Sequence, residues 1–168
     1  SGNDVVPGFG SGGRAASPQQ IWWTVDPRFG SGPIETARAE LRALLLHEVH
    51  HLVRGWTMSR GTAGSRMIDA VVAEGMATAF ERDRTGRIPP YGRYPPDEVD
   101  DWVEELRGVE GLEAYGRWMF VHPDGRRWIG YRAGTYVIDR AMEACDCTAA
   151  DLVRRPTDEV LELAGMEE

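Results

Sequence analysis

Apolar side chains recur along the stretch that follows Pro33, largely at spacings of three and four: Ile34, Ala37, Leu41, Leu44, Leu45 and Leu52. This spacing places them on one side of an α-helix and predicts a buried stripe. Pro33 is tolerated in the first turn of a helix, and Gly55 is typical of the position just after the last turn. The pattern therefore predicts a helix from about Pro33 to Arg54.

A second periodic stretch predicts a helix from about Ser65 to Arg84, followed by Gly86. Its apolar positions are Ile68, Val71, Val72, Gly75, Met76, Ala79 and Phe80. Weaker patterns indicate more helical structure after Asp97, within residues 112–121, after Trp128 and in two short segments beyond Thr148. The proline-rich segment 88–96 interrupts this series, because proline cannot continue a helix or a central strand.

The first 25 residues have a different character. Residues 1–20 are rich in Gly, Ser and Pro, and we expect a flexible arm there. The sequence from Ile21 to Val25 has the β-branched and aromatic content of a strand, and Asp26-Pro27 ends it. The chain is thus expected to be a single domain over residues 21–168, of mainly helical α+β class, with a small sheet packed on the helix from Pro33 to Arg54.

Composition removes several classes of function. The 168 residues carry a net charge of −8, with 27 acidic residues against 19 basic ones, which argues against a nucleic-acid partner. No apolar run reaches the roughly 20 residues of a membrane span. Cys145 and Cys147 are the only cysteines, and we expect them to be reduced in a cytoplasmic protein.

The sequence His47-Glu48-Val49-His50-His51 lies late in the first predicted helix and contains the pattern His-Glu-x-x-His. One helical turn plus about 40° separates His47 from His51, so both imidazoles can converge on one ion. Glu48 is displaced by about 100° and suits the role of a base acting on a metal-bound water. His50 is expected to lie beside the site or on the surface. The motif predicts a zinc site with Glu48 as the catalytic base.

Glu74 is the candidate third ligand. It lies in the middle of the second predicted helix among Val71, Val72 and Met76, where an uncompensated carboxylate would be costly. Gly75 would leave room for close approach of a neighbouring helix. Asp69 is a candidate for orienting a ligand histidine, with a purely structural role equally open.

Two residues could stabilise the negative oxygen that develops during hydrolysis. Tyr131, between Gly130 and Gly134, could donate its phenol hydrogen, although a packing role is an equal alternative. His122 could do the same, but its position in His122-Pro123-Asp124-Gly125 favours a surface turn. Arg132 is a weaker candidate for this role.

Together these motifs resemble a known arrangement. The helix motif followed by Glu74-Gly75-Met76-Ala77 is similar to that of gluzincins, in which two histidines and a glutamate from the next helix bind zinc. With Gly130-Tyr131-x-x-Gly134, the chain also resembles a family of small bacterial domains of unknown function described as predicted zinc-dependent proteases. Thr78 stands where thermolysin-like enzymes have an aspartate, so other groups must orient the ligands.

The resemblance implies a zincin-like metallopeptidase domain over residues 21–168. It would be a zinc-dependent peptidase that acts on a peptide or protein substrate, with Zn²⁺ on His47, His51 and Glu74 and with Glu48 as general base. Two alternatives stay open from the residues themselves. One is a zinc hydrolase that acts on a non-peptide amide or ester. The other is a metal-stabilised binding module without catalytic activity.

Overall fold

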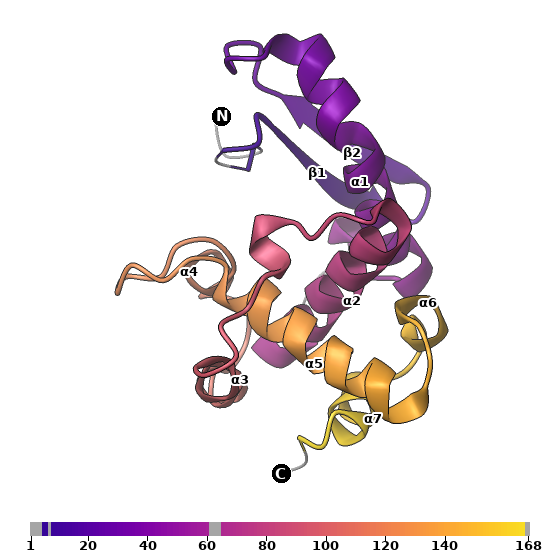
Figure 1. Cartoon of the computed structure of the whole chain (residues 1–168), viewed down its shortest axis with the longest axis vertical. Helices are drawn as coiled ribbons and strands as arrows, with labels where there is room; N and C mark the ends of the chain where they lie inside the picture. Colours follow the sequence, from indigo (N-terminus) through magenta and orange to yellow (C-terminus); the bar gives the residue numbers. More distant parts are fainter. Residues whose placement is uncertain (1–4, 7, 61–64, 167–168) are drawn as a thin grey trace. The chain divides into compact units, whose positions relative to one another are not determined.

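A computed structural model describes residues 5, 6, 8–60 and 65–166. The chain divides into two compact units, Ser1–Gly61 and Thr62–Glu168, where the sequence predicted one domain. The described residues form mainly α-helices and one two-stranded sheet (Figure 1). This confirms the expected mainly helical α+β class.

The sheet of the first unit corrects the prediction of a flexible arm. Strand β1 (Ser11–Ser17) lies in that segment and pairs antiparallel with β2 (Gln20–Val25), so that Gly13 faces Trp23. Gly13, one of the glycines that suggested a loop, is explained by the packing of the strand against helix residue Leu44. A Cβ at Gly13 would lie 2.5 Å from the side chain of Leu44, so only glycine allows this close approach.

Helix α1 (Gly32–Arg54) packs on this sheet and confirms the predicted helix. The predicted buried stripe is wrong, because Ile34 and Leu45 are exposed and the buried side chains of α1 are mostly those of the histidine motif. Its first turn contains Pro33, and Gly55 ends it in the left-handed conformation, with φ of 80°. The amide of Gly55 donates to the carbonyl of Leu52, and that of Trp56 donates to His51. This hydrogen-bonded end fixes the last turn of α1, which carries His51. The single-turn helix η1 (Met58–Arg60) follows.

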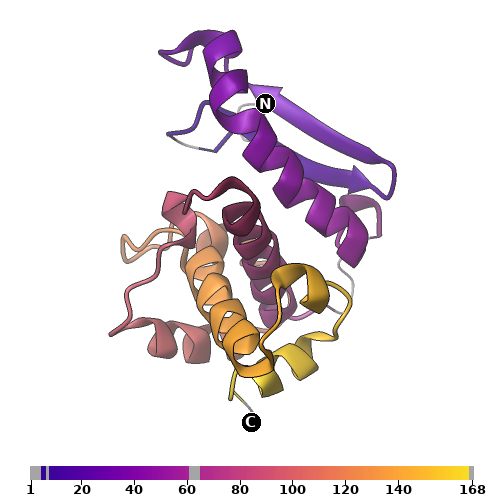
Figure 2. The same ribbon diagram turned by 45° about the vertical axis from the view of Figure 1, so that its right-hand side comes forward.

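The core of the second unit lies between α2 (Met67–Thr85) and α5 (Ile129–Cys145), which run side by side (Figure 2). Two glycines form their closest contact. A Cβ at Gly75 would lie 2.2 Å from the carbonyl carbon of Gly134, and a Cβ at Gly134 would lie 2.1 Å from the oxygen of Val71. The backbones of the two helices therefore touch, as Gly75 led us to expect, and the neighbouring helix is α5.

We expect Gly134→Ala to destabilise the protein by about 3 kcal/mol, because its methyl group would force two backbones apart. Thermal unfolding followed by circular dichroism measures the effect. Gly116→Ala is the matched control, since a Cβ there meets nothing within 4 Å and alanine favours the helix. Equal unfolding temperatures for the two variants would show that the close crossing does not exist.

The remaining elements surround this pair of helices: η2 (Pro90–Gly92), α3 (Val99–Arg107), α4 (Tyr115–Met119), α6 (Ala149–Leu152) and α7 (Thr157–Leu163). The predictions of a helix after Asp97 and of two short helices near the C-terminus are confirmed. Within 112–121 only five residues are helical.

The cysteines differ from the prediction. Cys145 and Cys147 form a disulfide across the end of α5, where we expected free thiols. In the part of the chain that the structure describes, no helix is long and apolar enough to span a membrane.

Candidate metal centre

The last two turns of α1 present the histidine motif. His47 and His51 lie on the same side of the helix, with their ring centroids 4.8 Å apart and their planes at 78°. Both side chains are buried, with exposed fractions of 7% and 4%. Glu48 and His50 are buried as well, which excludes the surface alternative for His50. A cluster of buried ionisable groups is costly to fold unless it serves a partner or an ion.

Glu74 lies in the middle of α2, on a helix whose neighbouring side chains are almost all buried. It is 5% exposed. The hydroxyl of Tyr115 donates a hydrogen bond of 2.9 Å to its Oε1. Burial, followed by the charge of Glu74, raises the pKa of Tyr115 well above its usual value. Tyr115 therefore stays protonated at ordinary pH and remains a hydrogen-bond donor.

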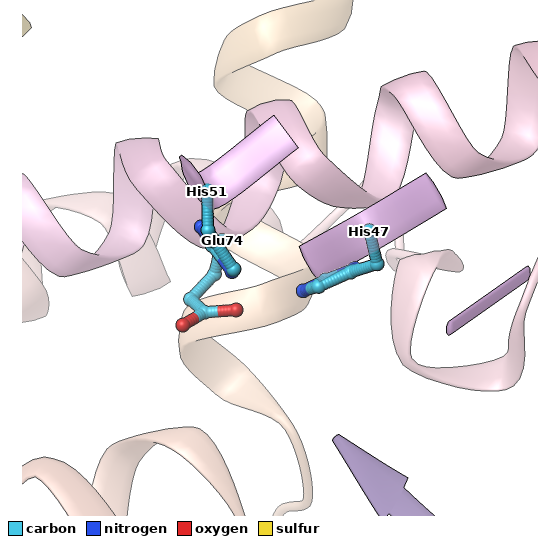
Figure 3. A group of neighbouring side chains, drawn as sticks. All are labelled: His47, His51 and Glu74. Carbon is cyan, nitrogen blue, oxygen red and sulfur yellow. The ribbon is translucent and has the colours of Figure 1, made fainter. Parts of the chain in front are cut away.

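His47, His51 and Glu74 form one group of possible ligands, shown in Figure 3. Each offers one ligand atom, and these atoms all lie within 4.8 Å of one another. Ligands of a tetrahedral zinc ion, at bond lengths of about 2.0–2.2 Å, are about 3.4 Å apart, so small side-chain rotations would bring these atoms onto one ion. Two imidazoles and a carboxylate are also a donor set that suits zinc. The residues fit the metal.

Tyr115 is the site residue that the sequence did not indicate. It lies on the five-residue helix α4, outside any motif, and a single tyrosine in a weakly periodic segment carries no signal. Tyr131, the residue singled out from the glycine-flanked segment, also contributes to the raised pKa of Tyr115. Tyr131 lies on the first turn of α5 and contacts Tyr91, at 5.3 Å between ring centroids. Tyr131 therefore lies near Tyr115, the residue that donates to Glu74.

Asp69 has a structural role at the start of α2. Its carboxylate accepts the backbone N–H of Arg66 at 2.8 Å and pairs with the Arg66 guanidinium at 3.0 Å. Burial raises its pKa, but its hydrogen bonds with Arg66 and Thr157 outweigh that and leave the pKa below its usual value. The alternative in which Asp69 orients a ligand histidine is therefore wrong, because the helix terminus takes its hydrogen bonds.

His122 and Arg132 are held by other contacts. Nδ1 of His122 lies 2.8 Å from Oδ2 of Asp124, in the turn that the sequence favoured, and its ring contacts that of Trp118 at 4.6 Å between centroids. The guanidinium of Arg132 lies over the ring of Trp128, at 5.5 Å from its centroid, and burial lowers its pKa. Neither arrangement indicates a role in stabilising a negative oxygen.

The buried His-Glu-x-x-His helix and the nearby glutamate define a protein with a potential metal-binding triad. The comparison with protein families agrees with this class. The chain belongs to the family described as predicted Zn-dependent protease (DUF2268), whose model matches residues 3–162. No curated protein and no solved structure matches the chain.

Proposed function

We propose that this protein is a zinc-dependent metallopeptidase of the gluzincin type, which hydrolyses peptide bonds. The observation that carries the proposal is the convergence of His47, His51 and Glu74, whose possible ligand atoms lie within 4.8 Å of one another. Membership of a family described as predicted Zn-dependent protease supports the same reaction. A buried Glu48 adjoining a ligand supports catalysis over a purely structural metal, which needs no such base.

In this proposal His47, His51 and Glu74 hold the metal. When bound, zinc would supply a coordinated water of lowered pKa and would polarise the carbonyl of the substrate. Glu48 would act as the general base and accept the proton of the water that attacks the peptide carbonyl. Glu48 then gives the proton to the leaving amine, so the carboxylate is restored at the end of each turnover.

Tyr131 is proposed to donate its phenol hydrogen to the negative oxygen of the tetrahedral intermediate. Its support is its place near Tyr115, which donates its own hydrogen to Glu74. A phenol near Tyr115 would also be close to the carboxylate of a proposed ligand. A donor at that place would act on the substrate without binding the metal.

The test is a digest of a broad peptide library by protein loaded with zinc. We expect cleavage that disappears when a chelator removes the metal and returns when zinc is restored, because every step depends on the metal site. Elemental analysis of the same samples should give one zinc per chain in the active ones. Hydrolysis of small esters or amides without peptide cleavage would replace the peptidase by another zinc hydrolase. Bound zinc with no hydrolysis at all would indicate a binding module.

A further inference from the structure

Tyr115 is held in place independently of Glu74. It begins helix α4, whose last residue, Met119, is fully buried. Met119 lies against the start of α5, where a Cβ at Gly130 would come within 2.3 Å of its Sδ. A backbone hydrogen bond also joins the end of α4 to the start of α5, since the amide of Trp128 donates to the carbonyl of Phe120 at 2.9 Å. These contacts anchor the segment, so the phenol of Tyr115 reaches Glu74 from a fixed base.

We propose that Tyr115 is the positioning residue of the metal centre, which orients the carboxylate of Glu74 so that the metal binds it in one geometry. The inference rests on the proposed function, because it takes Glu74 as a ligand. Its own support is the hydrogen bond of 2.9 Å to Oε1, given by a residue that no motif contains.

The physical effect is a loss of rotational freedom. A carboxylate with several acceptor positions can turn about its bond to the side chain, and a donor on one oxygen restricts that turn. Metal-binding groups in proteins commonly have such hydrogen-bonded supports, whose removal weakens metal affinity by about 10- to 100-fold. Thr78 stands at the place of the aspartate in thermolysin-like enzymes, and its Oγ1 makes no hydrogen bond within the described part of the chain. Tyr115, in contrast, donates to the proposed ligand itself.

The same helix offers a matched control. Glu81 lies two turns after Glu74 on α2 and is also buried, with an exposed fraction of 4%. The hydroxyl of Tyr91 donates to its Oε2 at 2.8 Å. Tyr91→Phe and Tyr115→Phe therefore each remove one hydroxyl that donates to a buried glutamate of α2. Of these two glutamates, only Glu74, the partner of Tyr115, is a proposed metal ligand.

The experiment measures zinc affinity of the full chain by competition with a chromogenic chelator, for the wild type and both variants. We expect Tyr115→Phe to weaken zinc binding by about 10- to 100-fold and Tyr91→Phe to change it by less than about threefold. The unfolding temperatures of the zinc-free proteins should fall by similar amounts. A merely structural Tyr115 would lower stability and leave zinc affinity unchanged.

Each outcome decides between the two claims. A wild type that binds no zinc overturns the proposed function and this inference together. A wild type that binds zinc, with equal affinities in both variants, overturns the inference alone. If Tyr115→Phe does not fold, 3-fluorotyrosine at position 115 in the otherwise unchanged chain replaces it. Its ¹⁹F resonance should shift when zinc is added, while the same label at position 91 should not, and equal responses would overturn the inference.

Discussion

Glu48→Gln is expected to lower the rate of peptide hydrolysis by about 10²- to 10⁴-fold, which is the usual contribution of general acid–base catalysis. Glutamine has nearly the same shape as glutamate and can occupy the same buried place on α1. It has no basic oxygen that can accept the proton of the attacking water. The proton transfer is therefore lost while the three proposed ligands remain.

Single-turnover cleavage of a peptide found in the library digest measures this effect, with zinc content determined on the same preparation. Glu35→Gln is the control, because Glu35 lies exposed in the first turn of the same helix and pairs with Arg38. Its rate should equal that of the wild type. A Glu48→Gln protein that binds zinc and cleaves at the wild-type rate would remove Glu48 from the mechanism.

The sequence predicted the two ends of α1 closely because several local signals agree there. Pro33 and Gly55 mark its two ends, and the left-handed conformation at Gly55 is one that glycine adopts without strain. The spacing of His47 and His51 then follows from helix geometry alone, without any knowledge of the tertiary structure. Elements defined by such local rules can be predicted from one chain.

Strand β1 and Tyr115 could not be predicted in this way, since their reasons are tertiary. Gly13 is required by the side chain of Leu44, which lies far along the chain, and in the sequence alone it is typical of a loop. Tyr115 is defined by its partner Glu74, 41 residues earlier. Glu74 could be predicted in part. Its charge among apolar residues indicated a functional site, but its distance to the histidines depends on the tertiary structure.

Glu74→Gln tests that third ligand, and we expect it to weaken zinc binding by at least about 100-fold. A neutral amide is a far poorer ligand for zinc than a carboxylate. The loss also has a stability signature. Zinc at 1,000 times its dissociation constant stabilises the folded wild type by about 4 kcal/mol, and a 100-fold weaker affinity leaves about 1.4 kcal/mol at the same concentration. Thermal unfolding with and without zinc measures both values.

Without zinc, the Glu74→Gln substitution should not lower the stability of the protein. Removal of zinc takes its positive charge away from the buried carboxylate of Glu74. Glutamine avoids the cost of burying a charge, while its carbonyl can still accept the hydrogen of Tyr115. We therefore expect zinc-free Glu74→Gln to unfold at the wild-type temperature or above it. Glu81→Gln, at the other buried glutamate of α2, should keep the full stabilisation by zinc. If Glu74→Gln were stabilised by zinc as strongly as Glu81→Gln, Glu74 would not be a ligand, and the proposed centre would be reduced to two histidines.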